Sequence, residues 1–347
     1  MFHNPNRHFS RLLLSLSFIF VSATAGAQNS AKDFLGGLLS RTTLHGYAHV
    51  GYQMKSDSKT TENSFLSKYI FLIADAQITE RWSARMMYGF NAGGVHDLYL
   101  DYMAAPWLHF RLGQFKTTFG MENPNSPATQ ELIDVCSQAT NYFAGSAPDP
   151  LFGNHAGRDA GVKAWGNLLD GQLYYEVGLY NGQGINQKDL NNHKDLEGKL
   201  TWTFMKGLSM TGSFHLGKGH AVGLSDANPD IKIGDNYKRD RWALGAQYTG
   251  DNGLKVRMEY MRGKDGKVDG EGYYALACLP IKGHLEGILS YDYLNKNKDL
   301  GMSKTNYVAG LQYWFYDRCR VQAQYTYSNS DYYLCQHTVQ VQLQLGF

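Results

Sequence analysis

The last ten residues of the chain alternate between apolar and amide side chains. In residues 338–347, TVQVQLQLGF, valine and leucine occupy every second position, and three glutamines stand between them. A period of two places the two kinds of side chain on opposite faces of a β-strand. A transmembrane β-barrel needs strands of this kind, apolar towards lipid and polar towards the lumen. We therefore expect the glutamines to line a wet, hydrogen-bonding inner wall.

The amino-terminus carries the signs of export. Arg7 and Arg11 precede the apolar run 12–21, and small residues follow, ending in Ala25-Gly-Ala27. A basic start, a short apolar segment and a small-x-small site are typical of a secretory signal peptide. The run is shorter than the roughly 20 residues that a spanning helix needs. We predict a signal peptide over 1–27 and a polar periplasmic lead-in over 28–43.

Composition excludes several classes of function. The formal net charge is +2 for 347 residues, and no basic tract with interleaved aromatics is present, which argues against nucleic-acid binding. The mean hydropathy of −0.40 resembles that of a soluble protein, but a β-barrel hides its membrane signal in alternation. The four cysteines, at 136, 278, 319 and 335, show no CxxC spacing. We expect no metal site and no cofactor.

Residues 44–347 are predicted to form one domain, a 16-stranded antiparallel transmembrane β-barrel. An even number of strands is the rule for such barrels. Short and long connections are predicted to alternate strictly, which places tight turns on the periplasmic side and long loops outside. The predicted strands are 44–54, 67–78, 82–91, 96–104, 107–116, 159–166, 171–181, 195–205, 208–218, 240–249, 254–262, 271–280, 284–294, 305–315, 319–328 and 337–347.

Aromatic residues stand at both ends of the predicted apolar rows. Amphipathic rings are enriched where a barrel crosses the two bilayer interfaces. A large soluble β-sandwich or soluble barrel is the alternative, and such folds rarely combine this loop pattern with two aromatic rows. The aromatic residues are Trp82, Phe204, Phe315 and Phe347 near the tight turns, and Tyr52, Tyr260, Tyr293 and Tyr327 near the long loops.

One connection, 117–157, is too long for an ordinary hairpin loop. It contains several large apolar residues, among them Leu132, Phe143 and Phe152, so its composition is not that of a disordered segment. A barrel of 16 strands leaves an open channel, and an ordered loop between strands five and six can fold inward and narrow it. We predict this inward constriction loop; an extracellular flap is the alternative.

Local motifs resemble those of the phosphate-selective porin O and P family. They are the stretch 111–122, RLGQFKTTFGME, the stretch 157–162, GRDAGV, and the stretch 179–187, LYNGQGINQ. The resemblance implies a homotrimeric outer-membrane porin of a Gram-negative bacterium, with an inward loop as its constriction. It also implies passive diffusion of small hydrophilic solutes or ions, with phosphate or other anions as the family's substrates.

The predicted charges of the interior fit that substrate class poorly. Fixed positive charge must meet an anion that leaves water in a narrow pore. Strand parity predicts six bases in the lumen, Arg85, Arg111, Lys163, Lys199, Lys255 and Arg257. It predicts eight acids, Asp75, Asp97, Asp101, Glu176, Glu197, Glu259, Glu286 and Asp292. We therefore expect a general porin with weak or no anion selectivity.

The long connection is itself acidic. Between Met121 and Gly157 it contains no lysine or arginine. Its acids are Glu122, Glu131, Asp134 and Asp149, and its flanking bases are Lys116 and Arg158. Lys116 is the nearest candidate for the lysine that the family carries on its constricting loop. Acids facing Arg85, Arg111 or Arg257 would set up a transverse field across the pore.

Other functions remain as alternatives. A plugged structural or adhesion barrel, or the outer-membrane component of a nutrient-uptake system, would share the strand pattern. A hydrolase would need a base within reach of a nucleophile, and the histidines are scattered over different strands without a nucleophile motif. We expect no enzymatic activity. The expected partners are outer-membrane lipid, the permeant solutes and two further copies of the chain.

Overall fold

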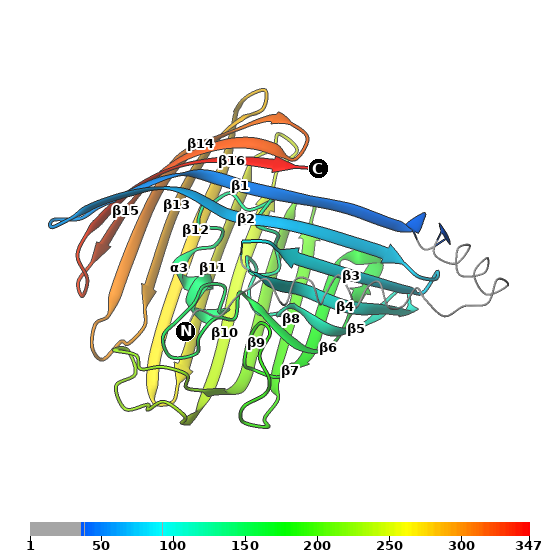
Figure 1. Ribbon diagram of the computed structural model, residues 1–347, viewed down its shortest axis with the longest axis horizontal. Coiled ribbons are helices and arrows are strands. Elements are labelled where there is room, and N and C mark those ends of the chain that lie inside the picture. The colour runs from blue at the N-terminus through cyan, green and yellow to red at the C-terminus, as the bar shows by residue number, and fades with distance from the viewer. Residues whose placement is uncertain (1–35, 38, 92) are drawn as a thin grey trace, which may run out of the picture.

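The computed structural model describes residues 36, 37, 39–91 and 93–347 (Figure 1). The predicted signal peptide, and most of the predicted lead-in, lie outside the described residues. Sixteen antiparallel strands form one closed barrel, in which each strand pairs with its neighbours in sequence and β1 pairs with β16. This confirms the predicted fold class. No helix among the described residues is long and apolar enough to cross a membrane.

The strand bounds show where the barrel begins and ends. The first half contains β1 (Thr42–Ser56), β2 (Thr61–Gln77), β3 (Trp82–Gly89), β4 (Gly94–Ala105), β5 (Leu108–Lys116), β6 (Arg158–Leu168), β7 (Leu173–Tyr180) and β8 (Asp195–Met205). The second half contains β9 (Leu208–His220), β10 (Asn236–Thr249), β11 (Lys255–Asp265), β12 (Val268–Lys282), β13 (Leu285–Asn295), β14 (Ser303–Tyr316), β15 (Cys319–Ser330) and β16 (Gln336–Gly346). Among the elements whose residues are all described, two are short helices, α3 (Gln138–Phe143) and η2 (Leu169–Gly171).

The predicted strict alternation of short and long connections is wrong. Strands β1 and β2 are longer than predicted, so that only residues 57–60 connect them. Strands β11 and β12 are also longer, and residues 266–267 alone connect them. The polar residues that the sequence assigned to loops pair across these hairpins instead. Long connections remain at 117–157, 181–194 and 221–235. They all lie at one end of the barrel, which we call the long-loop end; the other is the tight-turn end.

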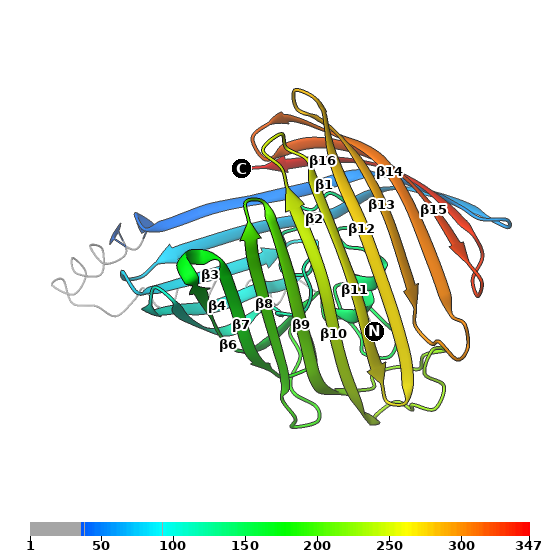
Figure 2. The same ribbon diagram turned by 180° about the vertical axis from the view of Figure 1, so that it is seen from behind.

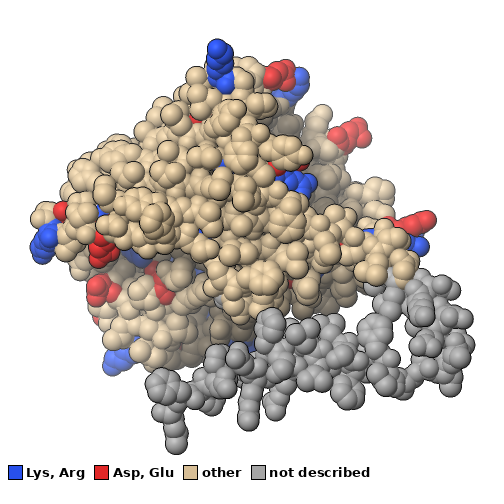
Figure 3. Space-filling view, turned by 45° about the horizontal axis from the view of Figure 1, so that its top comes forward, with Lys and Arg blue, Asp and Glu red and all other residues tan. Residues whose placement is uncertain are grey.

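The two faces of the strands differ as the alternation predicts. On β16, Val341 is 44% exposed, whereas the neighbouring Gln340 and Gln342 are buried. The same holds on β10, where Leu244 points outward and is half-exposed. In the face shown in Figure 3, uncharged side chains predominate and most charged ones lie towards the edges. The outer surface is therefore apolar over much of its area, although no other part of the protein covers it.

Aromatic side chains lie on this outer surface. Near the tight turns, Trp82, Phe204 and Phe347 are exposed. Near the long loops, tyrosines of neighbouring strands contact one another, with ring centroids 5.0 Å apart for Tyr273 and Tyr293. Rings at these positions are typical of a barrel that meets two bilayer interfaces.

The hydrophobic core lies between segment 117–157 and the inner wall, rather than between two sheets. Phe119, Phe143 and Leu151 of the segment are buried in one cluster with wall residues such as Met261 and Ile288. Helix α3 belongs to this segment and is drawn among the strands in both ribbon views (Figures 1 and 2). The Ser137 hydroxyl accepts from the backbone N–H of Thr140 and so caps the helix.

An arginine on the outer face should oppose insertion into a bilayer. We expect Leu244→Arg, on β10, to lower the free energy of unfolding from lipid by about 2–4 kcal/mol, because a charge near the middle of the apolar band must leave water. Leu224→Arg is the matched control, since Leu224 lies in connection 221–235 and is 68% exposed. Urea unfolding from lipid vesicles measures the free energy of unfolding of both variants. Equal and small changes in this free energy would contradict the assignment of the outer face.

Candidate functional site in the barrel interior

Segment 117–157 leaves and rejoins the wall at a single narrow neck. The Thr117 N–H donates to the Gly157 carbonyl at 2.9 Å, and the Asn123 amide donates to the same carbonyl at 3.1 Å. Gly157 has a φ of +63°, and a Cβ there would lie 1.9 Å from the Asn123 Oδ1 atom. Glycine is therefore required at this point. Lys116 donates to two backbone carbonyls of the segment, at 2.6 and 2.7 Å.

Wall carboxylates hold the first turn of the segment. Glu197, on β8, accepts from the backbone N–H groups of Thr118 and Phe119 at 2.7 and 2.9 Å. Glu259, on β11, accepts from the Met121 N–H at 3.1 Å. Hydrogen bonds to an ionised acceptor are among the stronger ones in proteins. Two of the predicted lumen acids thus anchor the segment to the wall.

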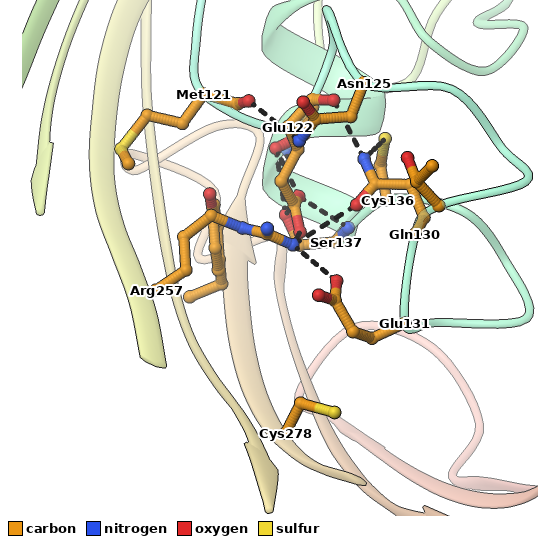
Figure 4. A network of polar contacts seen from close by, with 12 residues as sticks. Met121, Glu122, Asn125, Gln130, Glu131, Cys136, Ser137, Arg257 and Cys278 are labelled. Atoms are coloured by element: carbon orange, nitrogen blue, oxygen red, sulfur yellow. Dashed lines mark hydrogen bonds and ion pairs between the residues drawn. The ribbon is translucent and has the colours of Figure 1, made fainter. Parts of the chain in front are cut away.

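Arg257 forms the main ionic link between the segment and the wall (Figure 4). From β11 it donates to the Glu131 carboxylate at 3.0 Å and to the Glu122 carboxylate at 3.3 Å. Glu122 is fully buried, and its other oxygen accepts from the Ser137 N–H at 2.9 Å and from the Ser137 hydroxyl at 2.8 Å. One guanidinium therefore contacts two acids of the segment. Among the three arginines predicted to face the segment, Arg257 is the one placed to do so.

The glutamines of β15 and β16 bind the far side of the segment. Gln324 accepts from the Ile133 N–H at 2.9 Å and donates to the Glu131 carbonyl at 2.7 Å. Gln344 donates to the Ala128 carbonyl at 3.0 Å. The predicted wet wall is therefore wrong: these glutamines are buried, because the segment covers them and takes up their hydrogen bonds.

Several buried cations were missed by the sequence reading. Arg241, on β10, donates to the Asp265 carboxylate at 3.1 Å and to the Phe143 carbonyl at 2.5 Å. Arg320, on β15, donates to the Gln130 carbonyl at 2.7 Å. Both stand beside outward residues in sequence, so strand parity could have placed them inside. Arg158, predicted at the exit of the segment, donates to Asp97 of β4 at 2.7 Å.

The remaining acids of the segment are paired with one lysine of β2 and one of the connection between β13 and β14. Asp134 lies 3.1 Å from the Lys68 ammonium group, and Asp149 lies 2.8 Å from that of Lys296. Neither lysine was among the predicted lumen bases. The four acids of the segment thus share three cationic partners, Arg257, Lys68 and Lys296, which compensate most of the charge of the segment.

Arg85 and Arg111 bind neighbouring strands instead of the segment. Arg85 donates to Asp75 of β2 at 2.6 and 2.8 Å. Arg111 donates to Asp101 of β4 at 2.7 and 2.8 Å, and its guanidinium lies 3.7 Å from the Tyr99 ring centroid. Opposite charges in register on adjacent strands account for both pairs. The predicted transverse field therefore cannot involve these two arginines.

Two lysines of the predicted lumen set share one carboxylate. Lys163 of β6 lies 2.9 Å from Glu176 of β7, and Lys199 of β8 lies 3.3 Å from it. All three side chains are nearly buried. This triad continues the row of paired charges around the wall from β2 to β8.

Two cavities open at the tight-turn end of the interior, and we call them together the inner vestibule. One has a volume of 530 Å³ and a polar lining that includes Asp75, Arg85 and Arg111. The other has a volume of 810 Å³ and is lined by residues of the segment and of the wall, among them Thr129 and Trp314. Strand β1 contributes to both. The vestibule thus has a charged part beside β2–β5 and a more apolar part beside the segment.

Cys136 reports on the packing of the segment. All four cysteines are free thiols, and Cys136, Cys278 and Cys319 are buried whereas Cys335 is exposed. Burial, and then the charge of Glu122, raises the pKa of the Cys136 thiol to about 12.

Among the described residues, no group of three or more potential metal-ligating side chains is found.

Similar solved structures are outer-membrane channels and porins. The chain is similar to an anion-selective porin from Comamonas acidovorans, with 15% identity and a TM-score of 0.64 over 88% of this chain and 99% of that one. It is similar to OprB of Pseudomonas putida, with 11% identity and a TM-score of 0.65 over 92% and 96%. It is similar to the outer membrane channel DcaP of Acinetobacter baumannii, with 12% identity and a TM-score of 0.63 over 88% and 97%.

Comparisons of sequence find no match. No family model matches the chain, and no curated protein does. At 11–15% identity the structural likeness shows the fold alone, an outer-membrane porin-type barrel.

Removing the charge of Arg257 should release the segment. We expect Arg257→Met to destabilise the packed segment by about 3–5 kcal/mol, because Glu122 and Glu131 are left buried without their cation. Alkylation of Cys136, followed by mass spectrometry of its peptide, should then become about 100-fold faster or more, since the thiol reacts only when the segment opens locally.

The matched control is Arg85→Met. Its pair with Asp75 is about one-third exposed, so its loss should cost about 1 kcal/mol or less and leave Cys136 protected. Cys335 is exposed in every variant and serves as the internal reference. Rapid alkylation of Cys136 in the unaltered protein would contradict the packing described above.

Proposed function

We propose that the protein is an outer-membrane porin that allows passive diffusion of small hydrophilic solutes or ions. The observation that carries the proposal is the combination of an apolar outer surface with a charged and amide-rich interior in one closed barrel. Hydrocarbon outside and water inside would each meet the surface that they solvate best. The similar solved structures, which include an anion-selective porin and an outer membrane channel, support this function.

Segment 117–157 is proposed as the constriction. It is bound to the wall by carboxylates of β8 and β11 and by glutamines of β15 and β16. A segment held on several sides keeps a fixed cross-section in the channel. The inner vestibule supplies the space through which a solute would leave on the periplasmic side. The proposed orientation places the tight turns in the periplasm and the long loops outside.

Weak ion selectivity is the expected behaviour of this interior. Each acid of the segment has a cation beside it, and in the vestibule Arg85 and Arg111 are neutralised by Asp75 and Asp101. Paired charges attract a permeating ion of either sign less than unpaired ones do. The family resemblance points to phosphate, but the charge pairing supports a general porin.

The position of Lys116 supports the same conclusion. This residue is the nearest match to the lysine on the constricting loop of phosphate-selective porins. Its ammonium group donates to the Asn123 and Asn125 carbonyls at 2.7 and 2.6 Å, so it braces the neck of the segment. A lysine used in this way is a poor ligand for a passing anion.

A homotrimer is part of the proposal. One similar structure, of OmpT of Vibrio cholerae, is described as the trimer form. Its likeness to this chain has a TM-score of 0.64 at 13% identity over 88% of this chain. Light scattering of the detergent-purified chain tests the assembly, and a monomer would remove this part of the proposal.

Catalysis is not proposed. The two ring nitrogens of His215 lie 3.0 and 2.9 Å from the carboxylates of Asp195 and Glu197. Both nitrogens of this buried histidine face carboxylates instead of a serine, threonine or cysteine nucleophile, although its Nε2 atom makes no hydrogen bond. His45 likewise uses its Nε2 atom on Asp75, at 2.9 Å. These contacts support structural roles for both histidines.

Planar-bilayer recording tests the proposed function. The purified full chain should give stepwise conductance, grouped in threes if trimeric, and a reversal potential near zero in a KCl gradient, because the interior charges are balanced. A silent bilayer would indicate a plugged structural barrel. A reversal potential close to that of chloride would overturn weak selectivity.

Two single variants, at Asp134 of the segment and at its partner Lys68, should shift the reversal potential in opposite directions. Asp134→Asn leaves Lys68 unpaired and should move the reversal potential towards chloride, whereas Lys68→Gln should move it towards potassium. Their pair is one of the more exposed in the segment, so the change in charge should act with little loss of stability. Identical reversal potentials for both variants would mean that the Asp134–Lys68 pair lies outside the ion path.

A further inference from the structure

The more apolar part of the inner vestibule has the size of a small-molecule site, and we call it the apolar pocket. Its volume of 810 Å³ lies within the range of pockets that bury a small ligand, about 300–1,000 Å³. It is lined by residues near the tight-turn ends of β1, β2, β14 and β16, strands that lie close together around the barrel (Figure 1). Residues Ser126, Ala128 and Thr129 of the segment line the remaining side. The pocket is therefore large enough to hold a solute inside the channel.

Trp314, on β14, forms one side of the pocket and is held rigidly. Its indole N–H donates to the Glu286 carboxylate at 3.0 Å, and the Arg320 guanidinium lies over the ring, 4.7 Å from its centroid. Arg320 is buried and donates to the Gln344 side chain at 3.0 Å. The indole thus has its N–H edge bound and one face covered, and its remaining surface lines the pocket. A ring fixed in this way binds another ring with little loss of side-chain freedom.

Tyr47 and Ile73, on β1 and β2, form a second side of the pocket. Tyr47 is 4% exposed, and its ring centroid lies 5.3 Å from that of Phe71. Tyr47 and Ile73 belong to a buried apolar cluster, and Ala128 of the segment packs against that cluster. Strands β14 and β1 are three positions apart in the barrel, which is about 14 Å along the wall. This spacing leaves room for one ring between Trp314 and Tyr47.

Polar side chains of the lining that meet the segment are already hydrogen-bonded within the protein. The Gln344 amide donates to the Ala128 and Arg318 carbonyls, both at 3.0 Å. The Thr129 hydroxyl donates to the Ser126 carbonyl at 2.9 Å. Because these groups have partners, a solute gains little by hydrogen-bonding to them. The inner part of the pocket therefore favours apolar contact, which aromatic rings make over a large area.

The mouth of the pocket carries charged and polar groups that are exposed. His284 lies in the turn between β12 and β13, and Asp317 and Arg318 form the turn between β14 and β15. The Asp317 carboxylate and the Arg318 guanidinium are 4.0 Å apart, and an exposed pair at this distance contributes little to stability. Both charges are thus available to a solute whose ring lies deeper in the pocket.

We propose that the apolar pocket binds small aromatic solutes that carry a zwitterionic group, of which an aromatic amino acid is the simplest. The ring would lie against Trp314 and Tyr47, and the two charges of the solute would meet Asp317 and Arg318 at the mouth. Binding has to be weak enough to let the solute leave, so the affinity should lie in the millimolar range. The inference rests on the proposed porin function and names one class of solute for it.

Saturation-transfer difference NMR of the full chain in detergent tests the inference, with free phenylalanine as the probe. Saturation should reach the ring protons of the probe more strongly than its α proton, because the ring lies inside and the charged group lies at the mouth. Free serine, which carries the same charges without a ring, should give no signal above that of detergent alone. Equal signals from the two amino acids would overturn the proposal.

Two variants of Trp314 separate the contribution of the ring from that of the fold. Trp314→Leu and Trp314→Phe both remove the N–H that Glu286 accepts, but only Trp314→Phe keeps an aromatic side chain. We expect Trp314→Leu to bind free phenylalanine about tenfold more weakly than the unaltered chain, and Trp314→Phe about threefold more weakly or less, since contacts between rings contribute beyond the area that they bury. Equal binding by the two variants would contradict the proposed role of the ring.

Thr129→Trp tests the pocket from the side of the segment. Thr129 is exposed, so a larger side chain there should fill the pocket without disturbing the wall, and the signal from free phenylalanine should be lost. The control is Trp107→Leu, which removes a 53% exposed tryptophan in the turn between β4 and β5, away from the residues that line the pocket. It should bind the probe as the unaltered chain does. An undiminished signal in Thr129→Trp would overturn the proposal.

Conductance in a planar bilayer is measured separately from binding. A chain that conducts ions but does not bind free phenylalanine overturns this inference and leaves the porin function standing. A silent bilayer overturns the porin function whatever the NMR result, so the two failures are distinguishable.

Discussion

The fold depends on the requirement that each strand present an apolar face to one solvent and a polar face to another. Alternation satisfies this requirement residue by residue, and closure of β1 on β16 leaves no strand edge unpaired. The requirement also forces charge inward. Arginines, lysines and carboxylates that could not be tolerated outside accumulate on the inner wall, where they must find partners. The paired charges of the interior follow from the apolar exterior.

Segment 117–157 provides hydrogen-bond and ionic partners for those inner groups, and they provide partners for the segment. Arg257 meets Glu122 and Glu131, and Glu259 meets the backbone of Met121. The segment gains a hydrophobic core against β10–β14 that a surface loop would lack. Because three cations lie against its four acids, the segment shapes the interior without giving it a strong charge. This combination of a fixed shape and a balanced charge is the basis for proposing a weakly selective channel.

The sequence predicted the barrel well, because a period of two is a local signal that each strand carries by itself. All sixteen strands were predicted, and outward residues such as Leu244 and Val341 are exposed as parity requires. The interior was harder to predict. Its contacts join residues far apart in the chain, such as Glu131 and Gln324, and no local pattern encodes them. The sequence therefore predicts that the glutamines of β16 contact water. It does not single out Arg241 and Arg320, although strand parity places both inside.

The difference between the two faces can be measured with tryptophan. Trp242 points outward and is 47% exposed, whereas Trp314 points inward and donates its indole N–H to Glu286 at 3.0 Å. Variants that keep one of these tryptophans, with the others changed to phenylalanine, can be placed in bilayers of brominated lipid. The account predicts strong quenching of Trp242 by the lipid and little quenching of Trp314. Equal quenching of the two, or quenching of Trp242 by aqueous iodide alone, would contradict it.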